Sequence, residues 1–143
     1  MMISTRGRYA LRVIIDLAEH YNGEYIPLKE TAARQEISQK YLEGIMVTLS
    51  KAGLVEGAHG KGGGYRLNRA PEDYSVGDIL RVTECSLAPV ACLEDGAAPC
   101  SRAESCRTLG MWKNLYDMIN NYFNGLTIAD LMNSDESAGM YVI

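Results

Sequence analysis

A glycine-rich segment between two short apolar runs limits the folds that are open to this chain. The segment GAHGKGGG (57–64) lies between LVE (54–56) and YRL (65–67), and both runs have the composition of short strands. Two strands joined by a glycine-rich tip form a β-hairpin. A phosphate-binding loop of the P-loop type would need a helix after its glycines, whereas Gly64 is followed by a strand-like run. The segment therefore predicts a hairpin.

Two short helical patterns precede the hairpin. One begins near Leu28, and the other extends from Gln39 to Lys51, with Ser38 as its N-cap and a tight turn at 36–38 before it. This helix-turn-helix pattern alone is also typical of unrelated helical hairpins. The hairpin directly after it favours a winged helix. With further helices expected at 4–21 and 75–85, the predicted fold class is mainly α with a small β-wing: a winged helix-turn-helix domain plus a long dimerisation helix.

The charge distribution is uneven along the chain. Residues 1–69 carry 10 Lys and Arg against 7 Asp and Glu, whereas residues 70–143 carry 4 against 11, and the net charge is −4. The overall acidity argues against indiscriminate coating of nucleic acid, and the basic half is compatible with specific phosphate contacts. An accidental asymmetry of a solvated surface is the alternative.

Polar residues of the second helix and cations around it are the candidate DNA contacts. Polar and aromatic side chains at the start of such a helix can face base edges in the major groove, where Glu43 can accept a hydrogen bond from a cytosine amino group. The wing tip and the start of the chain would contact the backbone. The residues expected at DNA are Arg6, Arg8, Ser38, Gln39, Lys40, Tyr41, Glu43, His59, Lys61 and Tyr65.

A cysteine-rich loop follows at 86–106. Cys92, Cys100 and Cys106 have the spacing C-x7-C-x5-C in a stretch rich in Gly, Ala, Pro and Ser. No secretory h-region and no apolar run of membrane length is visible, so we expect a cytoplasmic protein that does not span a membrane. There, cysteines are more often reduced thiols, metal ligands or redox switches than structural disulfides. A structureless loop of about 20 residues also needs a reason, and a bound cluster or metal would supply one.

A long helix is predicted at about 107–124. Large apolar residues recur there at steps of 3, 4, 3 and 4, namely at Leu109, Trp112, Tyr116, Ile119 and Phe123. A core-facing helix is one interpretation. A dimer seam is favoured, because residues 4–85 can close a core without it. The expected organisation is a DNA-binding domain (1–85), a cluster-binding loop (86–106), a dimerisation helix with a short last helix (107–133) and a tail (134–143).

Five stretches together resemble the IscR/NsrR/CymR family of bacterial winged-helix transcription regulators. They are STRGRYALR (4–12), ISQKYLEGI (37–45), HGKGGGYRL (59–67), SVGDILRVTE (75–84) and WKNLYDMI…LTIADLM (112–132). The resemblance implies a homodimer that reads a palindromic operator in double-stranded DNA. It also implies that Cys92, Cys100 and Cys106 take the positions of the family's iron–sulfur cluster ligands, with 2Fe-2S favoured over 4Fe-4S. Zinc and a disulfide switch are the alternatives.

Several positions depart from the family pattern. Leu109 stands where IscR-type members place a histidine ligand, and Arg8 where NsrR-type members use an acidic residue. His59 stands where many members carry a wing arginine. The fourth ligand is therefore open, and the candidates are Cys85, the loop carboxylates Glu94, Asp95 and Glu104, or a residue of the partner subunit.

Other stretches are more similar to the CymR type, namely ISTRGRYALR (3–12), SLAPVACLED (86–95) and the Tyr-Val-Ile end. This similarity implies an alternative function, a cysteine or sulfur-metabolism repressor that works through thiol oxidation without a cluster. Its partner would be cysteine synthase, which accepts C-terminal peptides ending in isoleucine such as Ile143; an unstructured tail is the other interpretation. We expect no enzyme, because the chain has neither a nucleophile elbow nor HExxH, and only two histidines.

Overall fold

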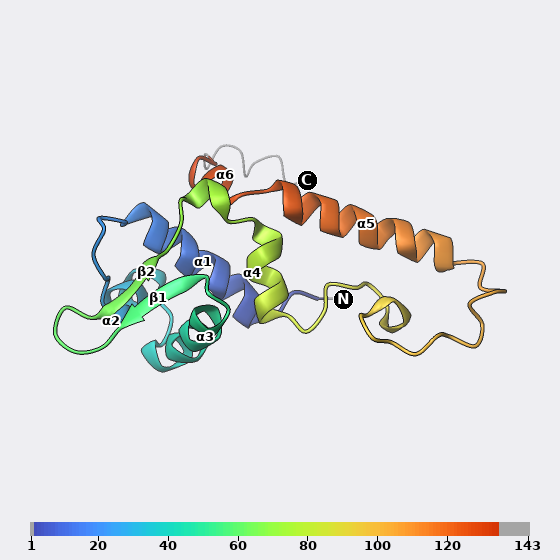
Figure 1. Ribbon diagram of the computed structural model, residues 1–143, viewed down its shortest axis with the longest axis horizontal. Coiled ribbons are helices and arrows are strands. Elements are labelled where there is room, and N and C mark those ends of the chain that lie inside the picture. Colours follow the sequence, from blue (N-terminus) through green and yellow to red (C-terminus); the bar gives the residue numbers. More distant parts are fainter. Residues whose placement is uncertain (1, 135–143) are drawn as a thin grey trace.

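The computed structural model describes residues 2–134, which form a helical body with one small hairpin (Figure 1). The elements in chain order are α1 (Thr5–Glu19), α2 (Leu28–Gln35), α3 (Gln39–Lys51), β1 (Val55–Ala58), β2 (Gly64–Leu67), the 3₁₀ turn η1 (Pro71–Asp73), α4 (Val76–Thr83), the 3₁₀ turn η2 (Ala91–Leu93), α5 (Leu109–Gly125) and α6 (Ile128–Met132). The winged-helix fold expected from the sequence is confirmed.

Short polar side chains begin most of these helices. The hydroxyl of Ser4 accepts a hydrogen bond from the Gly7 amide at 3.0 Å and starts α1. Ser38 does the same for α3 through the Tyr41 amide, at 3.1 Å. Reciprocal capping boxes start α4 and α6. Each cap satisfies amide groups that the first helical turn leaves without a partner, so the helix starts are determined locally.

The hairpin is anchored to the segment before α2. Strands β1 and β2 pair antiparallel, with Val55 opposite Leu67 and Ala58 opposite Gly64. Ile26 and Tyr65 exchange two backbone hydrogen bonds at 2.9 and 3.0 Å. Gly64 lies where β2 approaches the backbone at Ile26. Its φ is 143°, and a Cβ on it would come within 2.0 Å of the Ile26 carbonyl oxygen. The base of the wing therefore has a glycine for a steric reason.

One main core joins the helix-turn-helix, the wing and the last helix. Val13, Leu42 and Ile79 are fully enclosed in it, together with Tyr74, whose hydroxyl donates to the Leu54 carbonyl at 2.6 Å. Ile128 of α6 is buried in the same core, with 0% of its surface exposed. The short helix that we grouped with the dimerisation helix therefore packs into the body of the molecule.

Helix α5 packs on α4 by one face only. Tyr116, Ile119 and Phe123 lie against a small cluster built on α4, and no residue of the helix is fully buried. A neighbouring stripe is exposed: Met111 (53%), Leu115 (37%), Met118 (67%) and Tyr122 (66%). Three of the five residues expected at the seam pack within the chain, whereas Leu115 and Tyr122, which widen the expected face, are exposed, and the dimer stays a prediction. The helix carries two adjacent apolar stripes, and the periodicity did not separate them.

The wing and the cysteine loop lie toward opposite ends of the longest axis (Figure 1). The loop leaves α4, runs outward past η2 and returns at the start of α5, while the hairpin tip projects at the other end. Because the loop and the wing lie far apart, any influence of the loop on the α3 and wing region must pass through α4 or α1, or through another molecule.

Within residues 2–134, no helix combines the length and the apolar character that crossing a membrane requires.

Candidate nucleic-acid interface and cysteine loop

One face of α3 is buried and the opposite face is polar and exposed. Leu42 and Met46 are fully buried in the core. The exposed face carries the residues expected to read DNA, which are Gln39, Lys40, Tyr41 and Glu43. The Tyr41 ring is 43% exposed and contacts Tyr9 of α1 edge to face, with 5.7 Å between ring centroids. The helix therefore offers a row of hydrogen-bonding side chains of the kind that can enter a major groove.

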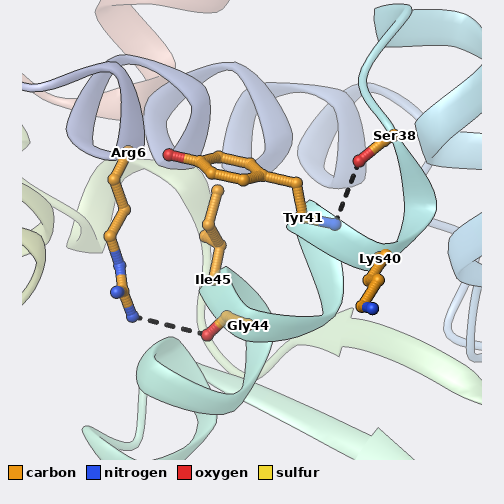
Figure 2. Close-up of a pocket in the computed structure, with 6 residues that line it drawn as sticks. All are labelled: Arg6, Ser38, Lys40, Tyr41, Gly44 and Ile45. Atoms are coloured by element: carbon orange, nitrogen blue, oxygen red, sulfur yellow. Dashed lines mark hydrogen bonds between the residues drawn. The ribbon is translucent and has the colours of Figure 1, made fainter.

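A pocket of about 480 Å³ lies on the α1 side of this row (Figure 2). Its six lining residues are Arg6, Ser38, Lys40, Tyr41, Gly44 and Ile45. The Arg6 guanidinium reaches across from α1 and donates to the Gly44 carbonyl at 3.5 Å and to the Thr48 hydroxyl. The six residues include two cations and no carboxylate, so the pocket has the charge that a phosphate requires.

A second groove, of about 570 Å³, lies between α3 and the wing. Gln39, Glu43 and Val47 line it from α3, and His59 and Tyr65 from the hairpin. Val47 is 46% exposed. Val47 was not among the residues expected at DNA, since an apolar residue on the polar face of a helix could only be found once the packing was known.

The remaining expected contacts lie near these two grooves or at the hairpin tip. Arg8 is exposed and donates to the Thr5 hydroxyl at 2.9 Å. Lys61 is exposed in the wing tip. Tyr65 is half-buried and packs against the edge of the main core. Tyr65 therefore has a structural role in the wing besides the backbone contact expected of it.

A buried ion pair fixes α2 against α1. The Asp16 carboxylate is 2% exposed and accepts three hydrogen bonds from Arg34, the shortest at 2.7 Å, and one from Gln35 at 2.9 Å. Burial alone would raise the pKa of Asp16. The hydrogen bonds from Arg34 and Gln35, together with the charges of Arg34 and His20, outweigh burial and lower this pKa below its ordinary value.

All four cysteines are free and exposed. In the part of the chain that the structure describes, no group of three or more His, Cys, Asp or Glu side chains could hold a metal ion. Cys92 lies in η2, whereas Cys100 and Cys106 lie at irregular positions of the long loop, on either side of the turn at 101–105. The structure therefore does not bring the three expected ligands together, although as thiols they match the donor set of an iron–sulfur cluster.

Cys106 lies three residues before the start of α5. Its sulfur is 3.5 Å from the Thr108 hydroxyl. Hydrogen bonds from the Thr108 side chain and backbone, and from the Leu109 amide, lower the pKa of the Cys106 thiol. Thiolate is the form that binds metals and reacts with oxidants, so the lowered pKa favours that form at Cys106.

Three of the four candidates within this chain for a fourth ligand line one small pocket of about 220 Å³. They are Cys85, Glu94 and Asp95, and the pocket lies between the end of α4, the loop and Tyr116 of α5. Glu104 does not line it. The three candidates therefore share one pocket wall, although they do not form a group that could hold a metal ion.

A polar contact joins the base of the cysteine loop to the start of α1. Glu84, the residue before Cys85, accepts hydrogen bonds from the Ser4 amide and hydroxyl, both at 2.8 Å. Gly7 leaves the necessary space, because a Cβ there would lie 2.3 Å from the Glu84 carboxylate. Since Arg6 of the same helical turn contacts α3, one continuous set of contacts leads from the loop to α3. The pairing spans 80 positions, and no sequence pattern indicated it.

Comparison with known proteins agrees with this architecture. The family described as Rrf2, iron-dependent transcriptional regulator, matches residues 3–134. The HTH-type transcriptional regulator IscR of Vibrio atlanticus is 35% identical over 136 residues, which are 95% of this chain and 78% of that protein.

Two solved structures are similar over nearly their full length. CymR (YrzC), the global cysteine regulator of B. subtilis, is 34% identical with a TM-score of 0.75, over 94% of this chain and 99% of that one. T. potens IscR is also 34% identical, with a TM-score of 0.74, over 99% of this chain and 96% of that one. The chain therefore belongs to the Rrf2 family of transcriptional regulators, in the group that resembles IscR and CymR.

Proposed function

We propose that this protein is a homodimeric transcription regulator that binds a palindromic operator in double-stranded DNA and responds to iron–sulfur cluster status. The observation that carries the DNA-binding part is the exposed polar face of α3, flanked by a cationic pocket on one side and the wing groove on the other. Gln39 and Glu43 would face base edges, and Arg6, Arg8 and Lys61 would face phosphates.

The dimer would form through α5. A 17-residue helix without a fully buried residue, with four large apolar side chains exposed in one stripe, is an incomplete packing surface. Pairing of two such helices around a two-fold axis would cover both stripes at once. It would also place two α3 helices at a fixed separation, as a palindromic operator with half-sites about one helical turn apart requires.

The cysteine loop would be the sensor. Cys92, Cys100 and Cys106 would hold the cluster, 2Fe-2S in preference to 4Fe-4S, and the Cys85 pocket supplies candidates for the fourth position. A bound cluster supplies a group that is sensitive to iron supply and oxidation. Ordering of the loop by a bound cluster would change operator affinity through two contacts. Glu84 joins the loop to Ser4, and Arg6 joins α1 to α3.

The test has two parts. Anaerobically purified protein should be coloured, contain iron and sulfide, and bind a duplex from upstream of its own gene with nanomolar affinity. Replacing Cys92 by alanine should remove the iron and the colour and leave the dimer folded. A colourless, iron-free wild type that still binds its operator would eliminate the cluster, and colour that survives Cys92→Ala would show that the ligand assignment is wrong.

A second candidate function keeps the same fold and uses thiols alone. It is favoured by the similarity to CymR and by the exposed Cys106, whose thiol has a lowered pKa. On this alternative, oxidation of the loop cysteines would change operator affinity in iron-free protein, and dithiothreitol would reverse the change. The proposed contact of Ile143 with cysteine synthase lies outside the described residues. Pull-down with cysteine synthase, with and without Ile143, would test it.

A further inference from the structure

Gly44 lies near the middle of α3, where nothing within the chain requires a glycine. Glycine destabilises the interior of a helix relative to alanine, so it usually has a steric reason. Gly7 and Gly77 have one, because a Cβ on either would lie within 2.6 Å of a neighbouring side-chain atom. A Cβ on Gly44 would meet nothing within 4 Å, and its φ is not positive. Gly110 of α5 has equally open space, so the open space alone does not assign a role to Gly44, and the groups around it carry the argument.

The surroundings of Gly44 indicate what approaches it. The residue is exposed and forms part of the floor of the α1-side pocket, where Arg6 and Lys40 come from opposite sides (Figure 2). The Gly44 carbonyl and the Thr48 hydroxyl hold the Arg6 guanidinium over this floor. The single carboxylate of the exposed α3 face, Glu43, lines the wing groove and not this pocket. The pocket therefore suits an anion, whereas the other side suits a hydrogen-bond donor.

We propose that Gly44 is the point of closest approach between α3 and a DNA strand, whose phosphate backbone enters the α1-side pocket. This inference rests on the proposed DNA-binding function and specifies it. The missing side chain lets a phosphate reach the space between Arg6 and Lys40. Gly44 and Thr48 position Arg6 there, so that the guanidinium meets the phosphate without losing side-chain entropy on binding. Phosphate contacts of this kind set the register of α3 in the groove.

The substitution Gly44→Ala separates folding from binding. Because the Cβ fits open space in the free protein, the variant should fold normally, and its thermal midpoint should equal that of the wild type or exceed it by roughly 2–5 °C. Its affinity for the operator should nevertheless fall about tenfold, the size of effect expected for one lost contact with DNA. Affinity for a random duplex should fall by the same factor, because a phosphate contact carries no sequence information.

Two further variants serve as matched controls. Gly110→Ala also places a Cβ in open space on a helix, but on α5, so it should give a comparable thermal midpoint with unchanged affinity. Arg6→Ala removes a cation from the pocket, so the slope of log affinity against log salt should decrease by about 1. Gly44→Ala keeps both cations but keeps the phosphate away from them, so its slope should decrease as well. Fluorescence anisotropy with labelled duplexes at several salt concentrations measures all three.

Each outcome has a defined meaning. If Gly44→Ala binds as tightly as the wild type, the inference is wrong and the proposed function stands. If affinity falls for the operator alone, α3 approaches a base edge at this position, and the assignment to phosphate is overturned. If the wild type binds neither duplex, the proposed function fails and this inference fails with it. A uniform loss with a retained thermal midpoint supports the inference.

Discussion

Asp16 shows how one buried charge fixes the orientation of the helix-turn-helix. Its carboxylate joins α1 to Arg34 and Gln35 at the end of α2, immediately before the turn that sets the direction of α3. A carboxylate removed from water is tolerated only when charged hydrogen bonds replace its hydration. We therefore expect this residue to affect stability, although it lies outside the candidate interface.

Replacing Asp16 by alanine should lower the free energy of unfolding by about 2 kcal/mol, the range for hydrogen bonds to a charged group. Arg34 is 33% exposed and stays partly hydrated in the variant, so the loss should not reach that of a fully buried pair. Urea unfolding followed by circular dichroism measures the difference. Asp117→Ala, on an exposed position of α5, is the control and should change stability by less than about 0.5 kcal/mol.

The contribution of Asp16 should also depend on pH. Because its pKa is lowered in the folded state from an ordinary value of 3.8, the stabilisation is complete above that value and is lost as the pH falls through the folded-state pKa. The difference in unfolding free energy between the wild type and Asp16→Ala should therefore be constant from pH 5 to 7 and shrink below about pH 4. Urea titrations at pH 7, 5 and 3 test this. A difference that grows at pH 3 would contradict the lowered pKa.

The hairpin depends on Gly64 more than on Gly60. Gly64→Ala would combine an unfavourable φ of 143° with a Cβ 2.0 Å from the Ile26 carbonyl. We expect it to destabilise the fold by more than about 2 kcal/mol. Gly60→Ala is the matched control, because Gly60 has φ of 84° and open space around it, so only about 1–2 kcal/mol should be lost. Thermal unfolding distinguishes the two, and equal losses would show that the contact with Ile26 is unimportant.

The contact between α4 and α1 gives the proposed sensor a physical connection to α3. Glu84→Ala removes the acceptor for Ser4, and Gly7→Ala displaces the same carboxylate by occupying its space. Both variants should still load iron. In both, the ratio between the operator affinities of the iron-loaded and the iron-free protein should fall about threefold or more. The reason is that about 1 kcal/mol of coupling free energy between the loop and α3 is removed.

Anisotropy titrations of each variant in both forms measure that ratio. Asp117→Ala is the control, since Asp117 is exposed on α5 and does not line the pocket beside Cys85. It should leave the ratio unchanged. If Glu84→Ala and Gly7→Ala retain the full ratio as well, the loop communicates with α3 by another route.

In the proposed dimer, the exposed stripe of α5 would be covered by the same stripe of the partner. Met118→Glu places a charge in the centre of that stripe and should convert a dimer to a monomer, because an unpaired charge in an apolar interface is strongly unfavourable. Lys113→Glu, on an exposed position outside the stripe, should remain dimeric. Sedimentation velocity measures both. A dimeric Met118→Glu would place the interface elsewhere.

The local elements could be read from the sequence because their causes are local. The cap Ser38, the helical periodicities and the glycine-rich tip indicated the helices and the hairpin within about two residues of their observed ends. Helix breakers, capping oxygens and glycines act on neighbouring residues, so short stretches contain the necessary information. The three-cysteine spacing likewise identified a chemical donor set, although the spacing says nothing of whether the sulfurs meet.

The connections between distant segments followed from the fold alone. The burial of Ile128 in the main core, the division of α5 into a packed and an exposed stripe, and the pairing of Glu84 with Ser4 each depend on which surfaces meet. Gly44 is the clearest case, because in the sequence it is one helical glycine among several. Its open surroundings and its place beside Arg6 exist only after α1 has packed across α3, since that packing creates the pocket.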